Sequence, residues 1–114
     1  MTTKKLTEQE LQDLQRYAEE QQNMRSTTKV KNMTSAKGNF VPNQFIIYTS
    51  KGKYFQSYNS IIALKDNNNN VFLDSYYWNY SRTTAKYRNM FLDELTPETK
   101  GKIKSGEHKL VNLN

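Results

Sequence analysis

Residues 71–92 read VFLDSYYWNYSRTTAKYRNMFL and predict a strand that passes through an aromatic cluster into a helix. Ser81, Thr83 or Thr84 can cap this helix, because a hydroxyl before the first turn accepts a bond from a free backbone amide. We expect the helix to end near residue 94. Four aromatic residues fall within five positions just before it: Tyr76, Tyr77, Trp78 and Tyr80. The segment therefore predicts a junction of sheet and helix in an α+β domain.

The predicted helix has an apolar face and a polar, basic face. Thr84, Tyr87 and Phe91 recur at helical spacing, so we expect this side to pack on the sheet. Three residues share another side at spacings of four and three, namely Arg82, Lys86 and Asn89. These three are the exposed residues of the helix in this interpretation.

Short runs of β-branched and aromatic residues predict the sheet, with strands at 45–49, 54–58, 59–65 and 71–74. Gly52 lies in the first turn, at the position that needs a positive φ. The runs predict a three- to four-stranded antiparallel sheet, a meander, with one helix packed on a face. Beyond that helix, Thr96 and Pro97 can begin a second short helix. Residues 107–114 form either a last strand or a tail.

The N-terminal region predicts an amphipathic helix over residues 7–24. Thr7 and Glu10 have the spacing of a capping box, and Leu11 and Leu14 begin a thin apolar stripe. This stripe either docks on the domain, which we favour, or pairs with a second copy in a homodimer.

Three parts are therefore expected: the N-terminal amphipathic helix in 1–25, a basic linker or arm in 26–39, and the α+β domain in 40–114. Residues 26–39 are polar and show no period. Their lysines either follow a phosphate backbone or belong to a solvated connection.

The composition excludes several kinds of chemistry. The chain has no cysteine and one histidine, His108, so one chain cannot assemble a Cys/His zinc site. The four glycines form no phosphate-binding loop. Asp66 and Asp74 flank a predicted turn, where Asp more commonly binds local backbone amides than acts in catalysis. We expect a protein that is not an enzyme and has no catalytic, metal or cofactor site.

Hydropathy and charge favour a cytoplasmic protein with an anionic partner. A mean hydropathy of -0.95 and short apolar runs exclude a spanning helix and a membrane partner. The N-terminus has no signal-peptide hydrophobic region. The net charge is +6, and residues 26–92 hold nine cations but two acids. Such a basic segment favours nucleic acid as the partner, although a lysine-rich solvated surface gives the same composition.

The aromatic and basic residues of 45–92 are the remaining candidates for a binding site. The tyrosines are too many for one small core to bury with satisfied hydroxyls, so some are exposed. Exposed tyrosines can stack bases while cations bind the phosphates of RNA or single-stranded DNA. The same residue types also dominate protein interfaces. The candidate binding residues are Lys51, Lys53, Tyr54, Tyr58, Lys65, Tyr76, Tyr77, Tyr80, Arg82, Lys86 and Asn89.

Two stretches carry a family resemblance: residues 52–63 read GKYFQSYNSIIA, and residues 78–92 read WNYSRTTAKYRNMFL. The pattern resembles a group of small proteins encoded by bacteriophages and plasmids of low-GC bacteria. The resemblance implies an origin in a phage or other mobile element. We therefore expect a non-enzymatic accessory protein that acts in the host cytoplasm. Such a protein binds a host protein or ribonucleoprotein, for example a defence nuclease in the manner of an anti-CRISPR protein, and inhibits or redirects it. Binding of RNA or single-stranded DNA through residues 45–92 is the alternative.

Overall fold

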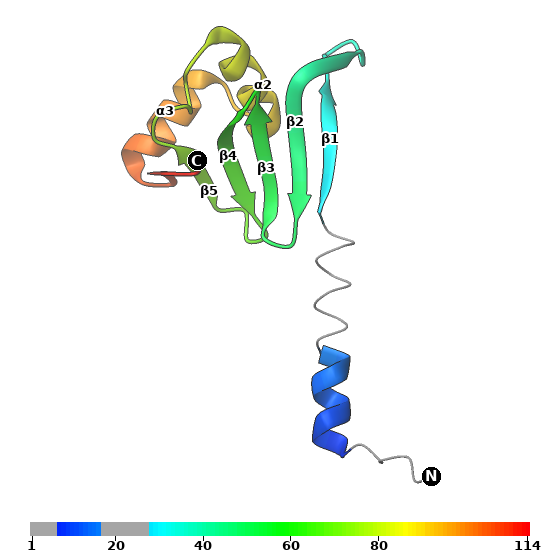
Figure 1. Cartoon of the computed structure of the whole chain (residues 1–114). Helices are drawn as coiled ribbons and strands as arrows, with labels where there is room; N and C mark the ends of the chain where they lie inside the picture. Colours follow the sequence, from blue (N-terminus) through cyan, green and yellow to red (C-terminus); the bar gives the residue numbers. More distant parts are fainter. Residues whose placement is uncertain (1–6, 17–27) are drawn as a thin grey trace.

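The computed structural model of the chain describes residues 7–16 and 28–114 (Figure 1). Its main feature is a six-stranded sheet, formed by β1 (Lys29–Thr34), β2 (Phe40–Thr49), β3 (Gly52–Ser57), β4 (Ser60–Asp66), β5 (Val71–Asp74) and β6 (His108–Val111). Two helices lie between β5 and β6 in the chain, α2 (Arg82–Leu92) and α3 (Thr96–Ser105). A further helix covers residues 8–16.

The strands lie side by side in chain order, from β1 to β6. Each neighbouring pair from β1 to β5 is antiparallel, whereas β5 and β6 are parallel. The prediction of a three- to four-stranded antiparallel meander is therefore wrong, because the sheet is mixed and has six strands. The fold is α+β only in the broad sense of that class.

The first additional strand, β1, lies in the segment predicted as a basic linker or arm. The sequence KVKNMT does not alternate apolar and polar residues in a way that would predict a strand. In the structure, Met33 is the one buried residue among its six. The backbone nevertheless pairs with β2, from Lys29 opposite Tyr48 to Asn32 opposite Phe45. Backbone pairing with β2, rather than burial of its own side chains, thus makes this segment a strand at the edge of the sheet. The linker prediction is wrong for residues 29–34, and the sheet begins before residue 40.

The second additional strand, β6, settles the two alternatives for the end of the chain. Residues 108–111 form a strand beside β5, with Val71 opposite His108 and Leu73 opposite Leu110. The predicted second helix is also present as α3, although Leu95 rather than Thr96 is its N-cap.

The predicted turns between strands are confirmed. Gly52 has a φ of 139°, and a Cβ there would overlap the backbone of Lys65 and Asp66, so this position requires glycine. In the turn between β4 and β5, Oδ1 of Asp66 accepts bonds from the amides of Asn68 at 2.9 Å and Asn70 at 2.8 Å. These bonds lower the pKa of Asp66, the largest contribution being the Asn70 amide. Asp66 therefore stabilises a turn, as the sequence indicated.

The N-terminal helix is described only over residues 8–16, and the rest of the predicted range 7–24 lies outside the described residues. The Thr7 hydroxyl accepts a bond from the Glu10 amide at 3.2 Å, as expected of a cap. Leu11 and Leu14 are exposed, so the favoured docking on the domain is not found for this part of the helix.

The core lies between α2 and one face of the sheet. Phe55, Ala63 and Leu73 lie opposite one another on β3, β4 and β5, and all three are fully buried. Tyr87 and Leu92 of α2 pack into the same cluster. The apolar face predicted for the helix therefore packs on the sheet, where α2 contacts β3 and β4.

The other face of the sheet carries an apolar row that lies outside the core. The row crosses five strands with one residue from each, in the register Val30, Ile47, Tyr54, Leu64 and Phe72. These side chains are exposed or half-buried, and none belongs to the core cluster or to the residues packed against it. We call these five residues the open apolar row.

Candidate functional site

Three polar side chains are in register on the face of the sheet that α2 covers. Tyr48 on β2 lies opposite Lys53 on β3, and Lys53 lies opposite Lys65 on β4. Side chains two residues apart share a face, so Lys53 and Lys65 lie on the same side as the buried Phe55 and Ala63. All three are exposed or half-buried, because they lie beyond the part of the sheet that the helix covers.

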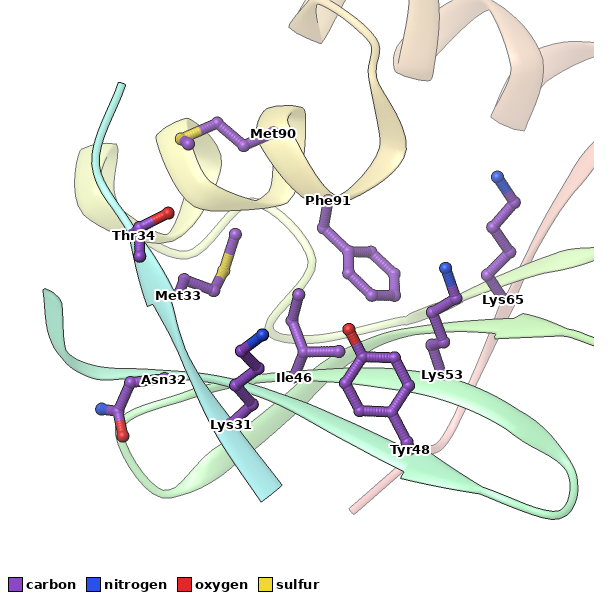
Figure 2. Close-up of a pocket in the computed structure, with 10 residues that line it drawn as sticks. All are labelled: Lys31, Asn32, Met33, Thr34, Ile46, Tyr48, Lys53, Lys65, Met90 and Phe91. Carbon is purple, nitrogen blue, oxygen red and sulfur yellow. The ribbon is translucent and has the colours of Figure 1, made fainter. Parts of the chain in front are cut away.

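These side chains belong to a groove of about 320 Å³ between the sheet and the C-terminal part of α2. We call it the lysine groove; its lining residues are Lys31, Asn32, Met33, Thr34, Ile46, Tyr48, Lys53, Lys65, Met90 and Phe91. Figure 2 shows Lys53 and Lys65 extending from the sheet toward the side on which Phe91 lies. The Phe91 ring stacks on Phe55 with 5.8 Å between ring centres, which fixes an apolar wall beside the lysines.

Charge is unbalanced in the lysine groove. Lys31, Lys53 and Lys65 line it, and no acidic residue does. Within residues 7–16 and 28–114, none of these lysines forms an ion pair. Like charges directly opposite on neighbouring strands destabilise a sheet, so the Lys53–Lys65 pair favours a bound anion.

A second hollow, of about 570 Å³, lies at the N-terminal end of α2. We call it the tyrosine cup; it is lined by Ser57, Tyr58, Asn59, Ser60, Ile62, Tyr77, Tyr80, Ser81, Thr83 and Thr84. The rings of Tyr77 and Tyr80 are tilted by 60°, with their centres 5.5 Å apart. Tyr58 is 54% exposed and Tyr80 is 64% exposed, so the aromatic surface is open to a ligand.

Asp74 holds the loop that carries two of these tyrosines. Its Oδ2 accepts bonds from the amides of Tyr76 at 3.1 Å and Tyr77 at 2.8 Å, and its Oδ1 accepts one from Leu113 at 2.8 Å. Burial raises the pKa of Asp74, but the bonds from Leu113 and Tyr77 outweigh burial, so this pKa lies below its ordinary value. Asp74 is therefore a charged loop anchor at neutral pH.

Hydroxyl groups hold the N-terminus of α2 against the sheet. The Ser81 hydroxyl caps the helix by accepting a bond from the Thr84 amide at 3.1 Å, as one of the sequence alternatives predicted. The Thr84 hydroxyl shares a buried bond of 3.1 Å with the hydroxyl of Ser57 on β3. This bond fixes the N-terminal end of α2, which forms one wall of the tyrosine cup.

The helix α2 connects the two hollows. Thr83 and Thr84 line the tyrosine cup at one end, and Met90 and Phe91 line the lysine groove at the other. Of the predicted binding residues, Lys53 and Lys65 lie in the groove, and Tyr58, Tyr77 and Tyr80 lie in the cup. Exposed cations on the helix between them are Arg82 and Lys86.

The remaining predicted binding residues lie elsewhere. Tyr54 belongs to the open apolar row on the opposite face of the sheet. Asn89 is a structural residue, because its side chain bonds Arg88 and Thr96. Lys51 lies in the β2–β3 turn outside both hollows, and Tyr76 contacts the cup tyrosines without lining the cup.

Sequence reasoning missed Tyr48 and the groove-lining role of Lys31. Lys31 lay in the segment predicted as an arm, so nothing indicated which way its side chain pointed. Tyr48 could have been found from alternation, since it lies two residues after Ile46 and directly opposite Lys53.

The most unexpected residue is Arg88, a cation of α2 that is fully buried. Its Nη1 donates to the Trp78 carbonyl at 2.6 Å and to Asn79 Oδ1 at 3.0 Å. Its Nη2 donates to Asn89 Oδ1 and Thr96 Oγ1, both at 2.9 Å. Burial lowers the pKa of Arg88 and the charge of Glu94 opposes this, but a guanidinium stays charged. Arg88 therefore joins the loop that contains Trp78 and Asn79 to the junction between α2 and α3.

His108 has a structural role in a cluster around Glu94. The Glu94 carboxylate contacts Lys102 Nζ at 2.6 Å and His108 Nε2 at 3.0 Å, and it accepts a bond from the Thr99 hydroxyl at 2.9 Å. Burial raises the pKa of Glu94, but the bonds from Lys102, His108 and Thr99 outweigh it and hold this pKa below its ordinary value. The cluster joins α3 and β6 to the end of α2.

The described residues lack two further features. No group of three or more His, Cys, Asp or Glu side chains is placed there to hold a metal ion. None of the helices in that part of the chain is both long and apolar enough to cross a membrane.

The sequence model of one protein family, described as a family of unknown function (DUF8033), matches residues 28–108. The chain belongs to this family. The DUF8033 region begins just before β1 and ends at the first residue of β6, so it contains every residue of the lysine groove and the tyrosine cup. No curated protein and no solved structure matches the chain significantly.

Proposed function

We propose that this DUF8033 protein is a non-enzymatic protein that binds single-stranded nucleic acid, either RNA or DNA. The observation that carries the proposal is the lysine groove, which three lysines and no acid line. Phosphates supply the negative charge that the Lys53–Lys65 pair lacks. The aromatic and apolar side chains beside the lysines suit the faces of unpaired bases.

The aromatic surface favours a single strand over a duplex. Stacking on a side chain needs a base with a free face, and each stacked base contributes about 1–3 kcal/mol. Tyr48 in the groove and Tyr58 and Tyr80 in the cup are exposed, whereas Tyr77 in the cup is half-buried. A duplex would present its phosphates to the lysines but keep its bases away from these rings.

Fluorescence anisotropy of labelled single-stranded oligonucleotides tests the proposal. Affinity should fall steeply with salt, and the double variant Lys53→Gln/Lys65→Gln should reduce the salt slope by about 1.4, since each single-strand phosphate contact contributes about 0.7. The matched control is Lys100→Gln/Lys104→Gln, which removes two exposed lysines of α3 and should leave the slope nearly unchanged. Absence of binding at low salt would contradict the proposal.

A second candidate function is binding of a host protein, and the open apolar row favours it. Five apolar side chains outside the core form a surface of the kind that a protein partner buries. This second function would fit the wider role expected from the resemblance. In that role, a phage or plasmid accessory protein inhibits or redirects a host macromolecule such as a defence nuclease.

Affinity capture from host lysate, with and without nuclease, tests this second function. A partner that survives nuclease treatment and is lost from the Tyr54→Ser variant would support it. If partners are recovered only when nuclease is omitted, this would count against the second function and would favour binding of nucleic acid in the lysine groove.

A further inference from the structure

The tyrosine cup differs from the lysine groove because no charged residue lines it. A charged ligand group would find no counter-charge within the cup. Tyr80 is tilted against Tyr77 and is 64% exposed, so its ring is open to another flat group, whereas Tyr77 packs partly against the core. Tyr58 adds a third ring that is more than half exposed. These features favour a ligand that is neutral, flat and aromatic.

The cup also offers hydrogen bonds. Asn59, Ser60 and Thr83 line it, and in the described part of the chain their side chains form no hydrogen bond. One amide and two hydroxyls provide both donors and acceptors. The edge of a nucleobase can bond this combination of groups, whereas a purely hydrophobic ring would displace water from them without replacing its hydrogen bonds.

We propose that the tyrosine cup holds an unpaired nucleobase of the same strand whose phosphates lie in the lysine groove, with α2 as the path between them. This inference rests on the proposed function and assigns a ligand group to a second site. α2 has 11 residues and is therefore about 16 Å long. A strand with bases about 3.4 Å apart covers this distance with about five nucleotides. Arg82 and Lys86, exposed along the helix, bind the phosphates between the two sites.

Adenosine tests the cup without the groove, because it has a base but no phosphate. We expect millimolar adenosine to shift the NMR signals of the Tyr58, Tyr77 and Tyr80 rings more than that of Tyr48 in the groove. Unchanged signals at the three cup tyrosines, or equal shifts at all tyrosines, would overturn the inference.

Two leucine variants test the cup in oligonucleotide binding. Tyr80→Leu should weaken binding of oligoadenylate about tenfold and leave the salt slope unchanged, because stacking is lost and no phosphate contact is. Tyr76→Leu is the matched control: Tyr76 is 71% exposed and contacts the Tyr80 ring, but it does not line the cup. Equal losses for the two variants would overturn the inference.

Oligonucleotide length gives a third measurement. Affinity should rise steeply up to about five nucleotides, the length that spans α2, and more slowly beyond it. If oligoadenylate binds through the lysines while the cup variants, the adenosine test and the length series show no effect, the proposed function stands and this inference falls. If adenosine shifts the cup tyrosines but no oligonucleotide binds, the proposed function falls together with the strand path, and the cup alone remains as a nucleoside site.

Discussion

At the residue scale, Lys65 connects the stability of the sheet with its proposed function. It lies directly opposite Lys53, and no acid lines the groove around them. We expect Lys65→Gln to raise the free energy of unfolding at low salt by about 0.2–1 kcal/mol, because it removes a like-charge pair across two strands. The same variant should weaken oligonucleotide binding.

Urea denaturation at low and high salt measures this effect. The gain in stability should shrink as salt screens the repulsion between the lysines. A variant that is less stable than the wild type at low salt would show that the lysine side chain stabilises the groove, contrary to this account.

Arg88 is the residue whose loss should damage the fold most. Arg88→Met removes a buried guanidinium and leaves the Trp78 carbonyl and the Asn79, Asn89 and Thr96 oxygens without this donor. We expect a loss of about 3 kcal/mol or more in the free energy of unfolding. Arg82→Met, on the same helix but exposed, is the control and should change it by less than about 0.5 kcal/mol. Similar losses for both variants in chemical denaturation would refute a structural role for Arg88.

At the element scale, Glu94 makes the attachment of α3 and β6 sensitive to acid. Its pKa in the folded protein lies below the ordinary value of 4.5. As the pH falls, the unfolded chain therefore takes up the proton first. The stabilisation from Glu94 is complete above about pH 4.5 and is lost as the pH falls through the lower, folded pKa. Asp74 also makes the folded protein less stable as the pH falls, since its pKa is likewise lowered.

Thermal unfolding between neutral and acidic pH measures the contribution of Glu94. The Glu94→Gln variant should be less stable than the wild type at neutral pH, because Lys102 and His108 lose their anionic partner. Its stability should also fall less than that of the wild type on acidification. Parallel curves for the two proteins would exclude Glu94 as a source of the acid sensitivity.

The elements differ in how far the sequence could predict them. β2 to β5 bury side chains in a recognisable pattern and have turns marked by Gly52 and Asp66, so a strand was predicted at each place, although β2 begins at Phe40 rather than at residue 45. β1 buries only Met33, and its pairing depends on β2, which no local pattern reveals. The parallel partner of β5 is also a non-local property, since β6 returns only after two helices.

The candidate site, like the strands, could be predicted only where a local sequence pattern indicates the direction of a side chain. Helical spacing predicted that Arg82 and Lys86 are exposed on the helix, and both are. Local patterns could not show that Arg88, four residues from Thr84 on the helix, turns inward to bond a loop carbonyl. Nor could they place Lys31, because the strand that positions it was not recognised.

At the scale of the whole molecule, the DUF8033 region should be independent of the N-terminal helix. The family match starts at residue 28, and Leu11 and Leu14 of the helix are exposed. We expect a chain of residues 28–114 to keep its unfolding temperature within a few degrees and to bind oligonucleotides as the full chain does.

Thermal unfolding, anisotropy and solution mass of the two chains check this independence. A large drop in unfolding temperature would contradict it. A fall in solution mass beyond that of the removed residues would instead reveal a homodimer formed through the N-terminal helix, the weaker alternative from the sequence.

The pairing of β6 with β5 also bears on the order in which the domain folds. β1 to β4 each pair with the next strand along the chain through a short connection, so these hairpins close with little loss of loop entropy. The β5–β6 pair joins Asp74 to Val111 across both helices, and such contacts of long sequence separation slow folding. Pulse-labelling hydrogen exchange during refolding should therefore show amides of β2 to β4 protected first and those of β6 last. Both hollows depend on the position of α2, whose C-terminal end the Glu94 cluster joins to α3 and β6, so they would be completed only in the final folding step.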